Sequence, residues 1–176
     1  MPSPVIIIPG IGNSGPLHWQ TLWEQSNPEF VRLQPRDWDE PICEEWSETL
    51  ETAAKNTGPD VVLVAHSLAC LVVAHWASGP HSPIKAALLV AVPDPAGPYF
   101  PKEALGFSNT PTGPLNFRST VVVSEDDAYT SPERARGLAR SWGSKLVDVG
   151  KCGHINAGSN LGAWPQGFEL LNELRA

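Results

Sequence analysis

Residues 61–69 have the sequence Val-Val-Leu-Val-Ala-His-Ser-Leu-Ala, which is the part of the chain most informative about its fold. It begins with an uninterrupted apolar run, which is typical of a parallel strand covered by helices on both faces. Apolar residues at helical spacing follow directly, over residues 68–77. We therefore predict a strand, a sharp turn and a helix, with Ser67 at the turn.

The same alternation of short apolar runs and amphipathic stretches extends from this point in both directions along the chain. The expected strands cover residues 5–8, 61–65, 86–92, 120–123 and 145–149, with a weaker strand at 30–33. The expected helices cover residues 17–25, 41–55, 68–77, 132–142 and 164–174. Strands that alternate with crossover helices predict an α/β fold, a three-layer α/β/α sandwich around a mostly parallel, doubly wound sheet. A ligand site is then expected at the carboxyl ends of the strands.

The bulk composition restricts the classes of partner. With 176 residues the chain is long enough for one domain with a sizeable core, so we expect a single domain over residues 1–176. A net charge of −7 opposes contact with phosphate backbones and anionic lipid headgroups, so neither nucleic acid nor a membrane surface is an expected partner. The sequence leaves the oligomeric state open.

The N-terminal stretch and the cysteines bear on location. Residues 1–8 contain no basic segment, and their apolar run is too short for a signal peptide. No apolar stretch of the sequence approaches the length needed to span a bilayer. The three cysteines are scattered and lack metal-type spacing, which fits a reducing compartment. We expect a cytoplasmic protein that binds no metal.

Ser67 fits the position of a nucleophile at a strand–turn–helix elbow. The residues two positions before and after such a serine must be very small, because larger side chains would collide with neighbouring backbone. Glycine is usual at both positions, whereas this chain has Ala65 and Ala69, which keep the turn feasible but weaken the motif. The alternative is a serine that merely caps the N-terminus of an ordinary helix, which is common.

A serine hydroxyl is a poor nucleophile unless a neighbouring base takes its proton. His154 lies in a glycine-flanked loop after the last expected strand, where such a base would be placed. The remaining histidines near the motif, His66 and His75, lie in the turn and in the following helix and are expected to point elsewhere. We therefore expect His154 to be the base.

A carboxylate is expected to orient the imidazole and to stabilise its cation. Residues 124–127, Ser-Glu-Asp-Asp, directly follow the strand at 120–123 and supply three candidates, with Asp94 as an alternative after the strand at 86–92. The chain order of serine, acid and histidine is that of α/β-hydrolases and differs from the orders in chymotrypsin and subtilisin. Together these positions predict a Ser–His–Asp triad.

The loop after the first strand, residues 9–15, has the sequence Pro-Gly-Ile-Gly-Asn-Ser-Gly. An oxyanion hole would combine a backbone N–H of this loop, most simply that of Ile11, with the N–H of Leu68 at the start of a helix. The alternative is a phosphate-binding glycine loop. Its glycines, however, lie one residue short of the dinucleotide spacing, and no Walker lysine follows.

Two further features bear on the substrate pocket. His18, Trp19 and Trp164 are expected to flank the pocket and to bind substrate. Residues 93–116 are rich in proline and glycine and have little periodicity, so they form either a pocket-lining loop or a plain surface connection.

Taken together, these motifs resemble the small serine hydrolases grouped with YdeN and retinoblastoma-binding protein nine. The resemblance is carried by residues 9–10, 15–20, 37–38, 66–68, 124–127 and 152–156. It implies a trimmed α/β-hydrolase fold without a large cap domain. It also implies that the acid is the second aspartate of the pair, Asp127 rather than Asp126.

The resulting hypothesis is a serine hydrolase that cleaves a small ester or amide through an acyl-enzyme on Ser67, as a carboxylesterase or a small-substrate amidase or aminopeptidase. Such chemistry requires no metal or organic cofactor. Two alternatives stay open: a non-catalytic interaction module on a hydrolase fold, and a nucleotide- or flavin-binding protein on a flavodoxin-like sheet.

Overall fold

The computed structural model describes residues 2–176, so Met1, at the start of the predicted domain range, lies outside the described residues. Six strands form one sheet in the order β2-β1-β3-β4-β5-β6, and all neighbouring strands run parallel. The strands are β1 (Val5–Ile8), β2 (Val31–Arg32), β3 (Val62–His66), β4 (Ala86–Val90), β5 (Arg118–Val123) and β6 (Lys145–Asp148). The predicted parallel sheet is confirmed.

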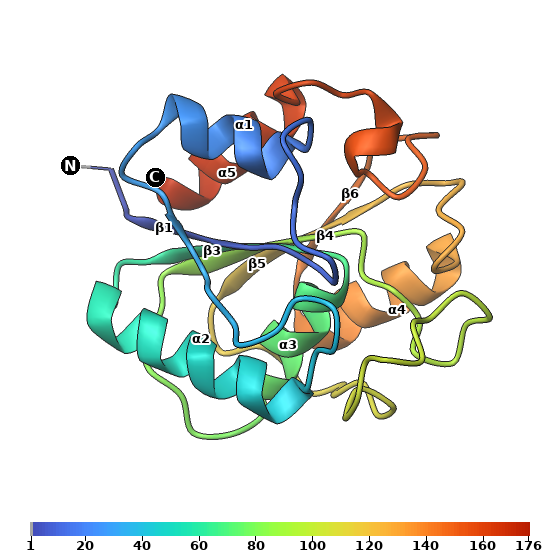
Figure 1. The fold of residues 1–176 in the computed structure, drawn as a ribbon, viewed down its shortest axis with the longest axis horizontal. Coiled ribbons are helices and arrows are strands. Elements are labelled where there is room, and N and C mark those ends of the chain that lie inside the picture. Colours follow the sequence, from blue (N-terminus) through green and yellow to red (C-terminus); the bar gives the residue numbers. More distant parts are fainter. Residues whose placement is uncertain (1) are drawn as a thin grey trace.

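Five α-helices cover the two faces of this sheet. They are α1 (Trp19–Ser26), α2 (Cys43–Thr57), α3 (Leu68–Ala77), α4 (Pro132–Trp142) and α5 (Pro165–Arg175), with a short 3-10 helix, η1 (Ala157–Ser159), before α5. Helices α1 and α5 lie on one face, and α2, α3 and α4 lie on the other (Figure 1). The predicted three-layer α/β/α sandwich is therefore confirmed.

The central strand β3 shows why the apolar run at 61–65 has no polar residue. Leu63 and Ala65 point into the cluster formed with α2, α3 and α4, whereas Val62 and Val64 point into the cluster formed with α1 and α5. All four side chains are fully buried. A strand with a helix layer on each side needs apolar residues at odd and even positions alike.

The ends of several elements differ from the predicted ones for local reasons. The strand predicted at 86–92 ends at Val90, because Ala91 adopts a positive φ of 57° and turns the chain out of the sheet. Helix α1 begins at Trp19 and not at residue 17, because His18 is its N-cap and accepts from the Gln20 amide through its side chain. Histidine is an uncommon N-cap residue, so this helix start could not be recognised from residue types alone.

Residues 93–116 contain no helix and make a single isolated β-bridge, between Leu105 and Ile42. The segment is nevertheless tied to the body of the protein. The indole N–H of Trp142 donates to the Pro111 carbonyl at 2.7 Å, and Phe107 is buried in the core. Its irregular backbone is therefore held in place at both α2 and α4.

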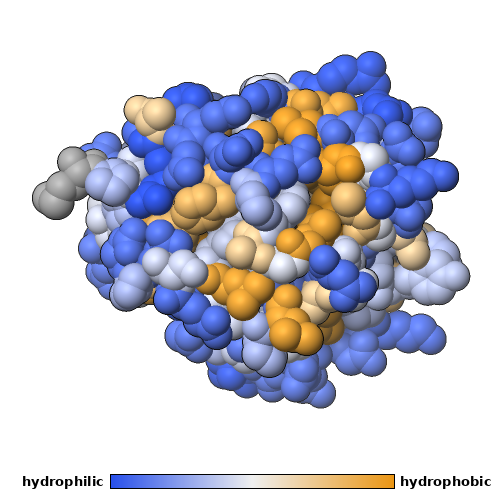
Figure 2. Space-filling model, turned by 90° about the horizontal axis from the view of Figure 1, so that it is seen from above, coloured by the Kyte–Doolittle hydropathy of each residue, from blue (hydrophilic) through white to orange (hydrophobic). Residues whose placement is uncertain are grey.

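The surface over α1 and α5 carries an interrupted band of hydrophobic residues among hydrophilic ones (Figure 2). Over the whole described chain, the large hydrophobic side chains with the greatest exposure are Leu17, Val31, Tyr99 and Leu105. Within residues 2–176, no helix combines the length and the apolar character that crossing a membrane requires.

Candidate active site

Ser67 lies at a strained turn between β3 and α3. Its φ of 55° and ψ of −125° are unfavourable for a residue with a side chain, and such backbone strain is concentrated at functional sites. The Ser67 amide donates to the Val90 carbonyl at 2.9 Å, which anchors the turn to β4. The side chain makes no capping hydrogen bond to the helix, so the alternative of an ordinary N-cap serine does not hold.

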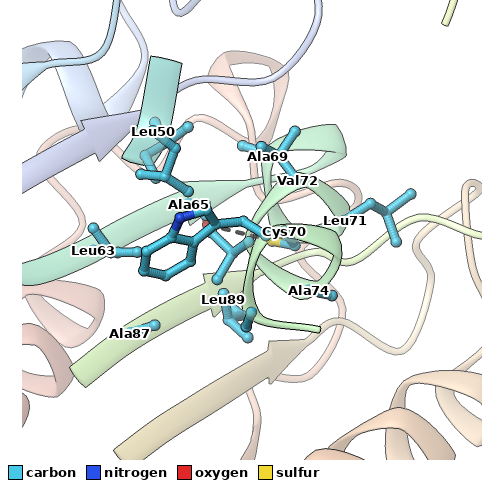
Figure 3. Packing of buried hydrophobic residues seen from close by; sticks show 14 of the residues in the cluster. Leu50, Leu63, Ala65, Ala69, Cys70, Leu71, Val72, Ala74, Ala87 and Leu89 are labelled. Carbon is cyan, nitrogen blue, oxygen red and sulfur yellow. Dashed lines mark hydrogen bonds between the residues drawn. The ribbon is translucent and has the colours of Figure 1, made fainter. Parts of the chain in front are cut away.

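The two alanines of the elbow are accommodated by the core. Ala65 ends the apolar run on β3, and Ala69 lies in the first turn of α3. Both alanines are fully buried in the hydrophobic cluster drawn in Figure 3. The closest approach at the elbow is instead made by Gly10. A Cβ at Gly10 would lie 3.2 Å from the Ser67 Cβ and 3.2 Å from the His66 carbonyl oxygen. The loop after β1 therefore reaches the serine only because residue 10 has no side chain.

His154 connects Ser67 to a buried carboxylate. The Ser67 hydroxyl donates to Nε2 of His154 at 2.7 Å. Nδ1 of His154 lies 2.8 Å from Oδ2 and 2.9 Å from Oδ1 of Asp127, and because an ionised carboxylate only accepts, Nδ1 carries the proton. The Asp127 side chain has no solvent exposure, and its Oδ1 also accepts from the Tyr129 amide at 2.9 Å. The arrangement fixes the imidazole tautomer that leaves Nε2 free to accept a proton.

The two other candidate acids contact different groups. Asp126 accepts from the Gly153 amide at 2.8 Å and from the Ser124 hydroxyl at 3.0 Å, and these hydrogen bonds lower the pKa of its carboxyl. It thus ties the backbone of the histidine loop to the end of β5. Asp94 forms an ion pair with Arg134 at 3.2 Å. Of the carboxylates considered, the structure brings Asp127 to the imidazole.

Ile11 and Leu68 are the residues whose backbone N–H groups the sequence suggests for an oxyanion hole. Both residues line the same cavity as Ser67 and His154. Among the backbone hydrogen bonds outside regular elements in residues 2–176, neither of these two N–H groups is a donor. The Gly12 amide fixes the loop by donating to the Trp38 carbonyl at 2.8 Å. Two N–H groups of this kind, one at a helix N-terminus, can stabilise negative charge on an oxygen.

The cavity over Ser67 has a volume of about 250 Å³. Part of its wall comes from residues 93–116, through Tyr99, Phe100 and Pro101, and another part from Tyr129. The Tyr129 ring lies 4.3 Å from the His154 ring between centroids. Residues 93–116 therefore form both a surface connection and a pocket-lining loop. The pair of aromatic residues at 99–100, in an otherwise proline- and glycine-rich segment, was the available signal for this wall.

His18, Trp19 and Trp164, which the sequence placed at the pocket, are not among the residues that line the cavity. All three are buried on the α1 and α5 face of the sheet. The Trp19 ring packs 5.0 Å from Trp164 and 4.5 Å from Trp23, between centroids. The expectation is corrected: large aromatic surfaces pack between the two helices and the sheet, behind the site.

His66 is a cavity residue that the sequence did not assign to the site. Its Nε2 lies 3.0 Å from the main-chain carbonyl of His154, and since a carbonyl only accepts, Nε2 carries the proton. Burial lowers the pKa of His66 well below its ordinary value, and burial also lowers the pKa of the adjacent His18 to about 4. Both rings are therefore neutral at physiological pH, and His66 braces the main chain of the base.

Comparison with known proteins agrees with this architecture. A model of the serine hydrolase family matches residues 5–173. A putative YdeN-like hydrolase from Pectobacterium atrosepticum superimposes with a TM-score of 0.88 at 29% identity, covering 97% of this chain and 89% of that chain. No curated protein sequence gives a significant match.

Two other solved structures share the fold at lower identity. The ydeN gene product of B. subtilis has a TM-score of 0.79 at 19% identity, with 97% of each chain covered. A thermophilic esterase from Thermogutta terrifontis has a TM-score of 0.70 at 17% identity, covering 99% of this chain and 91% of that chain. The predicted likeness to YdeN-type hydrolases and the α/β-hydrolase fold are confirmed. With its family model matched from β1 to α5, the chain belongs to the serine hydrolase family.

Proposed function

We propose that the protein hydrolyses small esters, and more slowly small amides, through an acyl-enzyme on Ser67. One observation carries this proposal: the Ser67 hydroxyl lies 2.7 Å from His154 Nε2, while both oxygens of Asp127 lie within 2.9 Å of Nδ1 of the same ring. A base within hydrogen-bond reach of the nucleophile, oriented by a third group, is the arrangement that activates a serine.

In the acylation step, Ser67 Oγ attacks the carbonyl carbon of the ester while His154 Nε2 takes the hydroxyl proton. The N–H groups of Ile11 and Leu68 stabilise the oxyanion of the tetrahedral intermediate. The intermediate collapses when the bond to the alcohol oxygen breaks, and the imidazolium returns the proton to that oxygen. Asp127 stabilises the imidazolium and remains ionised throughout.

In the deacylation step, water attacks the acyl carbon and gives its proton to His154 Nε2. The second tetrahedral intermediate uses the same two N–H groups. It then releases the carboxylic acid, and Ser67 recovers its proton from the imidazolium. The ester carbonyl is more electrophilic than the resonance-stabilised amide carbonyl, and an alkoxide leaves more readily than an amide anion, so acylation is faster with esters than with amides.

The size of the cavity favours a small acyl group. Its volume of about 250 Å³ lies below the range of roughly 300–1,000 Å³ that holds drug-sized ligands. Tyr99, Phe100, Pro101 and Ile11 give it an apolar wall close to the nucleophile. Tyr99 lines the cavity and is 64% exposed, so a longer acyl chain would reach the surface beside this residue.

The test is labelling with a fluorophosphonate, which phosphonylates an activated serine. Wild type, Ser67→Ala and His154→Ala are compared with Ser119→Ala, a buried serine toward the amino end of β5. Wild type and Ser119→Ala are expected to label, and the other two are not. An unlabelled wild type, beside a known serine hydrolase that labels, would contradict the proposal and favour an interaction module.

The acyl preference is tested with p-nitrophenyl esters of increasing chain length and with matching p-nitroanilides. We expect kcat/KM to be highest for acetate to butyrate and to fall for octanoate. Phe100→Ala is expected to raise the octanoate-to-butyrate ratio, because it shortens the cavity wall. A ratio that is the same in both proteins would show that Phe100 does not bound the acyl site.

A further inference from the structure

The first turn of α1 contains two side chains that the proposed mechanism does not use. Gln20 is fully buried, and its amide makes hydrogen bonds at both ends. Its Nε2 donates to the Ile8 carbonyl at 3.2 Å and to the Val64 carbonyl at 3.1 Å. Its Oε1 accepts from the Ser14 hydroxyl at 2.6 Å. One side chain thereby joins two strands and a loop.

These three contacts lie at the two halves of the candidate oxyanion hole. Ile8 is the last residue of β1, directly before the loop that carries Ile11, and Ser14 belongs to that same loop. Val64 lies on β3, three residues before Ser67. The Ile11 N–H lies in the loop after β1, and the Leu68 N–H lies at the start of α3, after β3. The separation of these two donors therefore depends on how the carboxyl ends of β1 and β3 are held together. Gln20 ties those ends to each other and to the loop.

The neighbouring residue Trp19 makes the corresponding contact on the side of the base. Its indole N–H donates to the Ile155 carbonyl at 2.8 Å. Ile155 directly follows His154, is fully buried and has a positive φ of 48°. The strained backbone at this point is therefore fixed by a side chain from α1.

The turn that presents both side chains is itself fixed. His18 caps the turn, because its Nδ1 accepts a hydrogen bond from the backbone N–H of Gln20 at 3.2 Å. The Thr21 hydroxyl donates to the Ser14 carbonyl at 2.9 Å, which adds a second link to the oxyanion loop. A site held by regular elements is more exact than one held by loops alone.

We propose that Gln20 and Trp19 are positioning residues, which hold the oxyanion loop and the histidine loop at a fixed separation by tying both to one turn of α1. The inference rests on the proposed function. Neither residue lines the cavity or touches the reacting atoms. A displacement of about 1 Å at a reacting centre costs on the order of a hundredfold in rate. Loss of the Gln20 or Trp19 hydrogen bonds is therefore expected to reduce turnover even in a folded protein.

Gln20→Met keeps the length of the side chain and removes its three hydrogen bonds. Oxyanion contacts act on the transition state, so kcat is expected to fall by roughly tenfold to a hundredfold, with KM within about twofold of wild type. Trp19→Phe keeps an aromatic ring and removes the indole N–H. It is expected to lower kcat by about threefold to tenfold, because only one contact to the histidine loop is lost.

Ser14→Ala removes the contact between the loop and Gln20 from the other side. Ser14→Ala and Gln20→Met are therefore expected to be non-additive, because each breaks the same hydrogen bond. A purely structural role would lower the amount of folded protein without producing this coupling in the labelling rate.

The experiment measures the rate of fluorophosphonate labelling, together with kcat and KM for p-nitrophenyl butyrate, in proteins shown to be folded by cooperative thermal unfolding. Two control variants remove partly buried hydrogen bonds far from the site. Ser119→Ala breaks the 2.6 Å contact with Ser144, and Trp76→Phe breaks the 2.8 Å contact with Glu51. Both controls are expected to label at the wild-type rate.

Folded Gln20→Met and Trp19→Phe variants that label as fast as wild type would overturn the inference. The inference would also be overturned if the labelling rate of the two control variants fell as much as that of Gln20→Met and Trp19→Phe. If Gln20→Met does not fold, Ser14→Ala carries the test, since slower labelling is expected in a folded protein and an unchanged rate contradicts the proposal. A wild type that does not label at all would instead refute the proposed function itself.

Discussion

Ser67 and Gly10 approach each other so closely that a Cβ at position 10 would lie 3.2 Å from the Cβ of the serine. The nearest surrounding atoms include main-chain atoms of His66 and Leu68, which cannot move aside independently. The loop after β1 and the elbow after β3 are thus packed backbone against backbone, and the separation of the two candidate oxyanion donors follows from this contact.

Gly10→Ala is therefore expected to push the loop away from the elbow by a few tenths of an ångström. We expect kcat for p-nitrophenyl butyrate to fall by at least about tenfold, because an oxyanion donor is misplaced. Steady-state kinetics with Gly15→Ala as control provide the check, since a Cβ at Gly15 meets nothing within 4 Å. Equal activities of the two variants would contradict the prediction.

Replacing Ser67 by glycine and by alanine is expected to separate strain from chemistry. Both variants lose the nucleophile and should not label. At a φ of 55°, glycine is relaxed and alanine is not, so Ser67→Gly is expected to have a free energy of unfolding about 1 kcal/mol higher than Ser67→Ala. Urea denaturation of the two proteins measures this difference. A more stable alanine variant would show that the turn is not strained.

The two adjacent aspartates are expected to behave differently. Asp127→Asn would place an amide against Nδ1 of His154 and favour the wrong tautomer, so kcat is expected to fall by about a thousandfold or more. Asp126→Asn loosens the Gly153 backbone and is expected to cost less than about tenfold. Comparable losses in kcat for the two variants would remove the distinction between their roles.

His18 is expected to make the stability depend on pH. Burial, with smaller contributions from Arg32 and His154, lowers its pKa from 6.5 to about 4 in the folded protein. As the pH falls through about 6.5 toward 4, the unfolded chain binds a proton that the folded protein does not. The contribution of neutral His18 to the free energy of unfolding is therefore fully present above pH 6.5. It is lost progressively as the pH falls to 4.

The measurement is the urea midpoint of unfolding between pH 4 and pH 7, for wild type and His18→Asn. Asparagine keeps a side-chain acceptor at the N-cap but does not titrate. The variant is expected to show a shallower dependence of the urea midpoint on pH. His66 and His75, whose pKa values burial also lowers, are among the groups that retain part of that dependence. Identical pH profiles would mean that His18 titrates alike in the folded and unfolded states.

The layout of the sheet could be predicted from the sequence because its inner strands β1, β3 and β4 are buried on both faces. Residues 5–8 and 61–65 are apolar throughout, which is the pattern of a parallel strand covered by a helix layer on each face. Ser67 comes directly after one of these buried strands, whereas His154 lies six residues after the partly exposed edge strand β6, in the loop beyond the last strand where a base was expected. The structure brings their side chains to 2.7 Å.

Other parts of the site could not be read from local patterns. Asp126 and Asp127 are adjacent, so spacing cannot decide which carboxylate faces the imidazole, and resemblance made that choice. His18, Trp19 and Trp164 have residue types common in pockets, but tertiary packing places them behind the site. The wall at Tyr99 and Phe100 comes from a segment without periodicity, whose path depends on distant contacts such as Trp142 with Pro111.

The indoles of Trp19, Trp23 and Trp164 give the protein a built-in optical reporter. Their ring centroids lie between 4.5 and 6.1 Å apart, close enough for their electronic transitions to couple. Near-ultraviolet circular dichroism is therefore expected to contain a strong contribution from this cluster. The Trp19 indole is hydrogen-bonded to the histidine loop through the Ile155 carbonyl. If the near-ultraviolet signal is lost before the far-ultraviolet signal during unfolding, the site has loosened while the sheet is still intact.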